Sequence, residues 1–470
     1  GILTGVNNVV IGKLAGDNMT SAGANVIIGE DAGAAQTTAD NNVLIGQGAG
    51  EGLTTGGDNI FVGTSAGDGH DAETNNLGIG KAALGGGIAG GEYNVAIGNQ
   101  ALDALTSGDQ NVAVGFASGT ALQGGANNTF VGNASGVAVT SGGNNTFVGC
   151  DAGTAVTTAD RNTMVGYGAG SAMTTGEKNV FVGYNAGLSG TDGSGVRNVG
   201  VGNQALLSLT DGQRNTAVGF TAGQLITTGE NNIAIGYSAA NGFDTENHNL
   251  AIGTDALGGS VAGGESNVAI GNSSLDALTS GDHNVAIGYI AGSALTTGND
   301  NILIGSQASM ADVSHSNAIV IGREISGSAN DFSFGKASNV VTNDFDTDAD
   351  WSRSSDVRLK RNIEDTTLGL QFINDLRPVK FQWKPSNEVP EIMTSEYNEE
   401  NQKNLDYISH GFIAQEVKEA IDKHGDQTFG GWHIDKTDNE TQRVKKNMFV
   451  MPLIKAVQEL SATVTTLQQE

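Results

Sequence analysis

The chain has few of the residues that crosslink a protein or anchor it in a membrane. Its single cysteine, Cys150, excludes an intrachain disulfide and gives no indication of the redox compartment. Aromatic residues make up only 5% of the 470 residues. No run of about 20 apolar residues is present, so we expect no segment that inserts into a membrane.

Proline and basic residues are also scarce, and their distribution divides the chain. All four prolines follow Ser355, whereas only five of the 71 glycines do. Residues 355–470 hold 14 Lys+Arg and 19 Asp+Glu, a net charge of −5. Subtraction from the whole-chain totals of 23 and 51 leaves 9 and 32 for residues 1–354, a net charge of −23. Two modules of different physical type therefore meet near Ser355. The acidic module disfavours nucleic acid as a partner, because phosphate binding requires Lys and Arg.

Residues 1–325 form an array of repeats. An apolar triplet ending in glycine occurs nineteen times, from Gly12 to Gly322, at spacings of 17 residues apart from two of 18 and one of 19. Ile or Val precedes the glycine in every unit, and Asn stands four positions before it in all units but that of Ala318. Short apolar strands recurring at this period predict a parallel β-solenoid with one coil per unit. A disordered glycine-rich linker is the alternative, but such linkers do not keep one apolar position through nineteen units.

The strand pattern predicts that the array is covered by a second surface, such as another chain. In the unit that ends at Gly98, Val95 and Ile97 point to one face of the strand and Ala96 to the other, and the face of Ala96 is apolar throughout the array as well. One face fills the solenoid, so the second requires a cover, most simply another copy of the chain. The Asn column is expected to hydrogen-bond along the stack. The units resemble the head repeats of trimeric autotransporter adhesins, which implies a trimeric β-roll.

The array shows no catalytic constellation and no cofactor or metal motif. Acidic turns such as those at Asp58 and Asp282 lack the Gly–Asp nonapeptide of calcium-binding β-rolls, and calcium binding stays open. Paired threonines are found in ice-binding solenoids, but adjacent threonines of a strand face opposite ways, so we interpret them as turn-edge residues. The four histidines of the array are expected to be solvated loop residues: His70, His248, His283 and His315.

Residues 326–354 are predicted to be a linker or neck, and residues 355–470 a small α+β domain. The expected elements of this domain are helices at 367–376 and 414–423 and strands at 379–383 and 411–413. Residues 448–470 form a heptad run, predicted to be a coiled coil in a dimer or trimer. Its core positions are Val450, Leu453, Val457, Leu460, Val464 and Leu467. The alternative is one amphipathic helix packed on its own domain.

Four motifs follow one another in residues 355–470. They are Ser355-Asp356-x-Arg358-Leu359-Lys360-x-Asn362-Ile363, Leu376-Arg377-Pro378-Val379, Gly411-Phe412-Ile413-Ala414-Gln415-Glu416-Val417 and Pro452-Leu453-Ile454-Lys455-Ala456-Val457-Gln458-Glu459-Leu460. In this order they resemble the endosialidase-type (peptidase S74-like) intramolecular chaperone of phage tailspikes and tail fibres. The resemblance implies a folding device that trimerises a fibre and then cuts itself off. Residues 447–449 depart from it, because a tyrosine-containing segment is expected there.

Ser355 and Lys360 are the residues expected to carry the cut. The Ser355 hydroxyl can attack the carbonyl of Ser354 through a five-membered ring, which converts the amide to an ester that water then hydrolyses. Lys360 can take the hydroxyl proton only in its neutral form, which desolvation or nearby cations such as Arg358 and Arg361 favour. The scissile bond is therefore predicted between Ser354 and Ser355, in a single-turnover serine endopeptidase with a Ser–Lys dyad.

The rest of the first motif is expected to support this chemistry through Asp356, Arg358 and Asn362. A purely structural alternative also exists, in which Ser355-Asp356 caps a helix and Lys360 is exposed. His410, the only histidine beside a motif, is expected to have a structural role.

The sequence thus predicts a homotrimeric viral tail fibre or spike, located in the virion, that attaches to a glycan or protein receptor on a host cell. A bacterial cell-surface trimeric adhesin with the same self-cleaving chaperone is the alternative, and an ice-binding solenoid is a third. Because Gly1 opens directly into a repeat, without a signal peptide or anchor, we expect the chain to be part of a longer protein.

Overall fold

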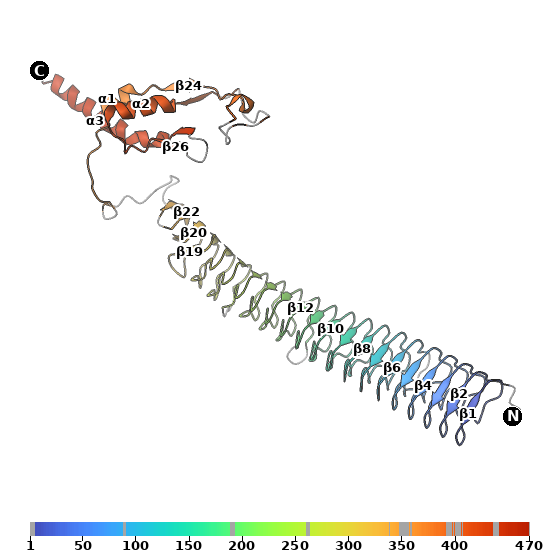
Figure 1. Ribbon diagram of the computed structural model, residues 1–470. Coiled ribbons are helices and arrows are strands. Elements are labelled where there is room, and N and C mark those ends of the chain that lie inside the picture. The colour runs from blue at the N-terminus through green and yellow to red at the C-terminus, as the bar shows by residue number, and fades with distance from the viewer. Residues whose placement is uncertain are drawn as a thin grey trace. The chain divides into compact units, whose positions relative to one another are not determined.

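The computed structural model divides into two units, Gly1–Arg353 and Ser354–Glu470 (Figure 1). The first unit is a long solenoid and the second a small α+β unit. The residues that the structure describes are 5–87, 91–188, 193–259, 264–337, 339–346, 357, 360–391, 397, 399, 406, 408–435 and 441–469.

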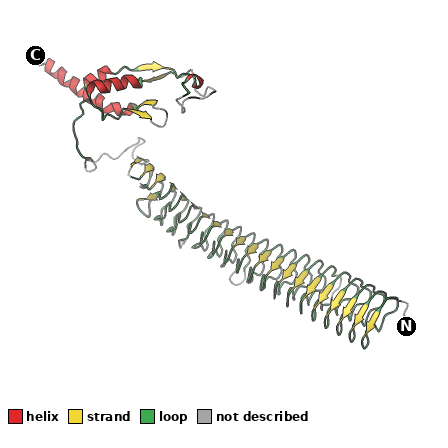
Figure 2. Cartoon of the chain, viewed as in Figure 1, coloured by secondary structure: helices red, strands yellow, loops and turns green. Residues whose placement is uncertain are grey.

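The solenoid consists of nineteen coils, each with one short strand. Consecutive strands pair in parallel and in register, so that Val95 lies beside Val112 and Ala96 beside Ala113. Figure 2 shows the strands stacked in a row, with turns and loops completing each coil. The repeat strands are β1 (Val9–Ile11), β2 (Val26–Ile28), β3 (Val43–Ile45), β4 (Ile60–Val62), β5 (Leu77–Ile79), β6 (Val95–Ile97), β7 (Val112–Val114), β8 (Thr129–Val131), β9 (Thr146–Val148), β10 (Thr163–Val165), β11 (Val180–Val182), β12 (Val199–Val201), β13 (Thr216–Val218), β14 (Ile233–Ile235), β15 (Leu250–Ile252), β16 (Val268–Ile270), β17 (Val285–Ile287), β18 (Ile302–Ile304) and β20 (Ile319–Arg323). The prediction of a parallel β-solenoid of about nineteen turns is confirmed.

The central residue of each strand points into the solenoid, and in many coils a large residue on one wall of the interior faces a small one on the other. Phe147 is fully buried, and a Cβ added at Gly153 would lie 2.6 Å from its ring. In some coils with a small strand centre the arrangement is reversed: the centre of β6 is Ala96, and a buried leucine, Leu102, takes the position of that glycine. A large residue on one wall is thus matched by a small one on the other, which fills the interior without overlap.

A ladder of buried asparagines joins every coil to the next. The backbone N–H of each asparagine donates to the side-chain Oδ1 of the asparagine one coil earlier, at 2.8–3.1 Å over the whole array. Ala318, which replaces the last asparagine, still donates its N–H to Asn301, at 3.0 Å. The predicted contact between side-chain amides is present at many steps, for example from Asn128 Nδ2 to Asn111 Oδ1 at 3.0 Å. The side chain therefore satisfies buried backbone groups as well as its neighbour in the column.

The glycine after each strand allows the coils to approach closely. Gly115 has a φ of 142°, and a Cβ there would lie 2.3 Å from the carbonyl oxygen of Gly132 in the next coil. Both the dihedral angle and the contact exclude other residues. This explains why the glycine is present in all nineteen units.

The outward face of the strands is apolar and uncovered in the single chain. Its residues are half-buried or exposed: Ile97 is 36% exposed and Ile235 is 38% exposed. The threonine pairs lie at the coil edge, where Thr37 Oγ1 donates to the Thr54 carbonyl at 3.1 Å and Thr157 Oγ1 to the Thr174 carbonyl at 3.3 Å. These hydroxyls hold neighbouring coils together, as expected for turn-edge residues.

The histidines of the array do not form one class of solvated loop residue. His248 and His283 are exposed and occupy the same left-handed position of their coils, with φ of 61° and 57°. His70 is instead fully buried at a position where the preceding coil carries Leu53, and its ring packs on Phe61. The expectation of solvation is therefore wrong for His70, because its position in the coil points into the core.

The sheet continues beyond residue 325. β20 pairs in parallel with β22 (Asp331–Lys336), which pairs in antiparallel with β23 (Asn339–Asp344). Two short strands, β19 (Ser309–Met310) and β21 (Ser326–Gly327), pair beside them. A hairpin thus follows the last coil and extends the sheet, so that β23 rather than β20 is its last strand within the described residues.

Within its described residues, the C-terminal unit combines three α-helices and two short 3₁₀ helices with two small antiparallel sheets. Its elements are α1 (Leu370–Asp375), β24 (Val379–Phe381), η2 (Ser386–Glu388), β25 (Ser409–Gly411), α2 (Ala414–His424), β26 (Trp432–Asp435), β27 (Thr441–Val444), η3 (Lys446–Phe449) and α3 (Val450–Leu467). The predicted helix at 414–423 agrees with α2 to within one residue. The predicted strand at 411–413 ends at Gly411, and the β26–β27 hairpin was not predicted.

Replacing Asn145 by alanine is expected to loosen the solenoid locally. The change leaves the N–H of Asn162 and the carbonyl of Ala159 without their partners, and each unpaired buried group costs about 1–3 kcal/mol. Hydrogen exchange should therefore show lower protection of the Asn162 amide. Asn144→Ala is the control, because Asn144 is exposed and Ala24 occupies the same position in another coil. Equal protection in both variants would contradict the role of the ladder.

Acid should destabilise the solenoid through His70. Burial lowers the pKa of His70 from 6.5 to about 4, with Glu73 partly opposing this. Between these values the unfolded chain binds a proton that the folded chain does not, so stability is lost as the pH falls from about 6.5 to about 4. The loss is on the order of 3 kcal/mol. His70→Leu should reduce the fall in melting temperature between pH 7 and pH 4.5, whereas the exposed-site control His248→Asn should not.

Candidate functional site

The predicted cleavage motif lies at the start of the C-terminal unit and is described only in part. Ser354, Ser355, Asp356 and Arg358 lie outside the described residues. Lys360 donates its backbone N–H to the carbonyl of Val357 at 3.0 Å, which closes a turn, and its side chain is exposed.

The next residues of the motif follow this turn. Asn362 is exposed and has a left-handed backbone, with a φ of 52°, a conformation that asparagine tolerates better than most residues. The described part of the motif is thus a bent, solvent-exposed segment, which leaves Lys360 accessible in the single chain.

The first helix after this segment is attached to the last helix of the chain. Leu370 donates its backbone N–H to the Oε2 of Glu459 in α3, at 2.8 Å. A Cβ added at Gly369 would lie 2.4 Å from the same oxygen, so the carboxylate can reach the start of α1 only beside a glycine. Leu368, immediately before, is buried in the core of the unit. The fourth motif is thereby fixed close to the end of the segment that carries the first.

The second and third motifs lie side by side. β24 and β25 pair so that Val379 lies opposite Gly411. Arg377 donates through two guanidinium nitrogens to the two carboxylate oxygens of Glu416 in α2. These bonds lower the pKa of Glu416 and raise that of Arg377. Such a two-pronged pair fixes the orientation of both side chains, which explains why both residue types belong to the motifs.

A second ionic cluster joins α1 to the end of α2. The carboxylate of Asp375 accepts hydrogen bonds from Lys423 Nζ at 2.8 Å and pairs with His424 Nε2 at 2.6 Å. Hydrogen bonding to Lys423, followed by that to His424, lowers the pKa of Asp375. Sequence reasoning did not identify this cluster, because Asp375 lies about 50 positions from its partners and no local spacing connects them.

The core of the unit is aromatic and includes the segment where the sequence departs from the family pattern. Phe449 is 7% exposed and stacks on Phe412 with 5.2 Å between ring centroids. Phe372 and Phe429 complete the group, and Phe372 is fully buried. Residues 447–449 thus supply a core anchor in place of the expected tyrosine.

His410 contributes to the unit through its backbone. It lies in β25 opposite Lys380, its side chain is exposed, and its carbonyl accepts a hydrogen bond from the Lys446 ammonium group. No group of three or more His, Cys, Asp or Glu side chains suited to a metal ion occurs within the described residues. Among the described helices, none has the length and hydropathy needed to cross a bilayer.

Comparison with known families supports the assignment of this unit. Residues 355–426 match the model of the family Peptidase_S74, described as chaperone of endosialidase. The C-terminal unit carries a chaperone of endosialidase domain. The match begins at Ser355 and includes the Arg377–Glu416 pair, and this family implies autoproteolytic activity. No curated protein matches the chain significantly.

Truncation of Phe449 tests the aromatic core of the chaperone domain. Phe449→Ala should lower its unfolding free energy by about 3–5 kcal/mol, because the alanine leaves a cavity among Phe372, Phe412 and Phe429. Met448→Ala is the control, since Met448 is 41% exposed. Denaturant unfolding of the full chain, followed by tryptophan fluorescence, should separate the two variants. Equal midpoints would show that Phe449 does not anchor the core.

Proposed function

We propose that this chain is a homotrimeric fibre or spike protein that attaches a virion to its host. In this proposal its chaperone domain drives assembly and then releases itself between Ser354 and Ser355. The observation that carries the proposal is the order of the two units: a chaperone of endosialidase domain beginning at Ser355 directly follows a long β-solenoid. That order suits a fibre whose helper domain is removed after folding.

Two exposed apolar surfaces support assembly from several copies. The first is the outward face of the solenoid strands, and the second is the heptad stripe of α3. All six heptad positions are exposed in the single chain, from 45% at Val464 to 66% at Leu467. Pro452 and Ala456, on the other side of α3, are the helix residues buried against the unit. The heptad stripe therefore does not pack on its own domain, and a coiled coil of three chains would cover it.

Assembly would also explain how the exposed Lys360 becomes a base. A lysine takes a proton only in its neutral form, which burial favours. In the single chain Lys360 is exposed, and in this proposal neighbouring chains bury it. Cleavage would then follow trimer formation, and the chaperone domain would be removed only after the fibre has assembled.

The proposed reaction needs no cofactor. Ser355 Oγ adds to the Ser354 carbonyl as Lys360 takes the hydroxyl proton. The carbon–nitrogen bond then breaks, and the nitrogen of Ser355 leaves as an amine after gaining a proton. Water hydrolyses the resulting ester, which leaves a carboxylate on Ser354 and restores the hydroxyl of Ser355.

A trimeric adhesin on a bacterial surface is the second candidate. The Asn-x-x-x-Gly strand signature, which resembles adhesin head repeats, favours it, and the chaperone domain fits both candidates. A virion-attachment domain or a secretion signal in the full-length protein would separate them, since a fibre requires the first and an adhesin the second.

Intact-mass spectrometry and light scattering of the purified full chain test the proposal. Wild-type chain should form a trimer and yield a fragment with Ser355 as its new N-terminus, without added protease. Ser355→Ala should give an uncut trimer near three times 47.8 kDa. Lys360→Ala should cut at least about 100-fold more slowly, the range expected on loss of a general base.

Ser354→Ala is the matched control, because it removes a neighbouring hydroxyl but leaves the nucleophile, and it should still be cut. An uncut wild-type trimer would reduce Ser355 and Lys360 to structural residues. A monomeric uncut chain at micromolar concentration would contradict the assembly.

A further inference from the structure

A column of basic side chains runs along four consecutive coils of the acidic solenoid. It occupies the position just before the ladder asparagine, where every coil has a left-handed backbone with φ near 60°. The N–H of Arg197 donates to the Glu177 carbonyl and that of Arg214 to the Val196 carbonyl, both at 3.1 Å, so successive members lie beside one another. The members of this basic column are Arg161, Lys178, Arg197 and Arg214, all exposed.

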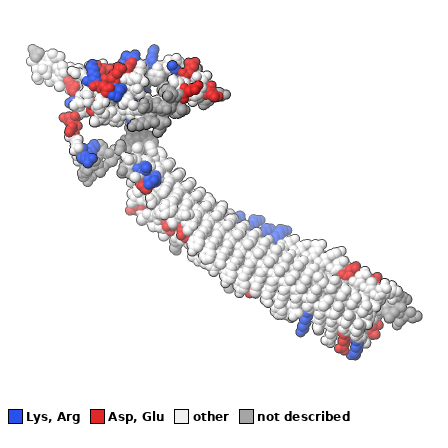
Figure 3. All heavy atoms as spheres, in the orientation of Figure 1, with Lys and Arg blue, Asp and Glu red and all other residues white. Residues whose placement is uncertain are grey.

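The clustering is not explained by the fold. A left-handed backbone favours asparagine, aspartate or glycine, and asparagine does fill this position at Asn127, Asn144 and Asn231. Residues 1–354 contain only nine Lys+Arg against 32 Asp+Glu, yet four of the nine stand in this one column. Figure 3 shows basic side chains gathered along one edge in the middle of the solenoid. Like charges one coil apart repel one another, so the column requires a compensating role.

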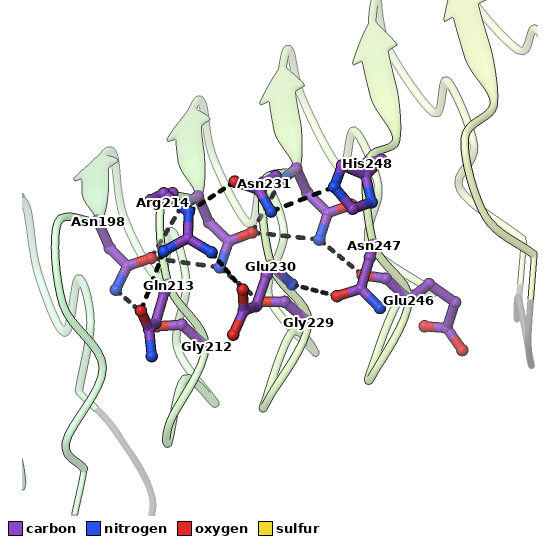
Figure 4. Close-up of polar contacts among 12 residues, drawn as sticks. Asn198, Gly212, Gln213, Arg214, Gly229, Glu230, Asn231, Glu246, Asn247 and His248 are labelled. Atoms are coloured by element: carbon purple, nitrogen blue, oxygen red, sulfur yellow. Dashed lines mark hydrogen bonds and ion pairs between the residues drawn. The ribbon is translucent and has the colours of Figure 1, made fainter.

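Two members of the column are neutralised within the chain. Lys178 Nζ pairs with Glu177 Oε2 at 3.2 Å. Arg214 pairs with Glu230 and donates to Asn231 Oδ1 at 2.7 Å (Figure 4).

Arg161 and Arg197, the other two members of the basic column, are not neutralised in this way. Among the residues that the structure describes, the guanidinium groups of Arg161 and Arg197 make no hydrogen bond or ion pair. The positions beside Arg197 that are acidic in other coils carry Val196 and Gln213. Two unpaired guanidinium groups therefore stand two coils apart, a separation of about 10 Å if coils are spaced by about 4.8 Å.

We propose that the basic column binds an extended acidic glycan that carries one carboxylate or phosphate per disaccharide. An extended chain of this kind repeats its charge at close to the length of two coils, which places successive anionic groups on Arg161 and Arg197. A guanidinium group suits such anions because it offers parallel N–H donors. The proposal rests on the attachment function above and names the receptor class and its site.

The spacing argues against an acidic peptide. Side chains on one face of an extended peptide recur about every 6.6–7 Å, which matches neither one coil nor two. Duplex DNA is disfavoured because a long, stiff polyanion lying on the solenoid would also meet its excess of carboxylates.

A partner copy is disfavoured as well. Between residues 150 and 219, where the basic column lies, no position of the repeat carries an acidic residue in more than two coils. A parallel trimer, whose chains meet at equal heights, therefore supplies no matching acidic column.

Calorimetric titration of the full chain with a hyaluronan octasaccharide tests the proposal, because this probe has one carboxylate per disaccharide. The wild-type chain should bind it, less tightly as salt is added, and should not bind the carboxyl-reduced octasaccharide. The double variant Arg161→Asn with Arg197→Asn should bind roughly tenfold more weakly, since an exposed ion pair contributes up to about fivefold to a binding constant. Asparagine preserves the fold because it occupies this position in other coils.

The control variant combines Lys13→Asn with Lys81→Asn. It removes the same charge from the solenoid outside the basic column, and Asn99 occupies the equivalent position in the coil after that of Lys81. The control should bind like the wild-type chain. Equal weakening in both double variants would show a general charge effect and overturn the site, as would absence of binding by the wild-type chain. A change in light-scattering mass in the column variant alone would instead assign the column to an interface between copies.

Adsorption of the labelled chain to a panel of encapsulated bacteria separates this proposal from the attachment function. If the wild-type chain and the column variant adsorb equally well, attachment stands and the glycan site lies elsewhere. If the wild-type chain adsorbs to no cell while cleavage and trimer formation are normal, the attachment function itself fails.

Discussion

The hydrogen bond from a backbone N–H to the asparagine Oδ1 of the preceding coil is the constraint on which the solenoid depends. A strand of three residues forms few hydrogen bonds with the neighbouring strands. The backbone of each coil must also turn sharply inside the solenoid. The turn would leave backbone N–H and carbonyl groups buried without partners, at a cost of several kcal/mol per coil. The asparagine side chain has both an acceptor and a donor, so it satisfies both kinds of group. It also fixes the register, because its partner lies at the same position of the next coil.

Fixed register turns every position of the repeat into a column along the solenoid. The interior columns exchange volume, as Phe147 does with Gly153 and Ala96 with Leu102. The outward strand positions become a largely apolar face, interrupted by a threonine in four coils. The left-handed position becomes either a polar edge or, over four coils, the basic column. A surface of this kind is long and uniform, and it is built from short strands whose pairing is not local. Such sheets form slowly and expose edges while they form, which gives a chaperone domain a physical purpose.

The chaperone domain is organised by contacts between distant parts of its sequence. Glu459 reaches the start of α1, Arg377 holds Glu416, and Phe449 closes an aromatic core between α1 and the last helix. The heptad stripe of α3 is left on the outside. The same helix therefore stabilises its own unit through one side and leaves the heptad stripe on its other side exposed.

The period of the repeats alone predicted the solenoid, its nineteen coils and its asparagine column. In a solenoid whose coils stack in register, residues at the same position of consecutive repeats become neighbours in space, so the repeat pattern is sufficient. The four motifs likewise identified the chaperone domain, and the heptads identified the exposed stripe of α3. Only the tertiary structure decided which strand face is the interior, that His70 is buried, and that Asp375 meets Lys423 and His424. It also decided that, within the basic column, Lys178 pairs with Glu177 and Arg214 with Glu230. These properties depend on the direction of side chains and on neighbours brought together by the fold, and sequence separation does not encode either.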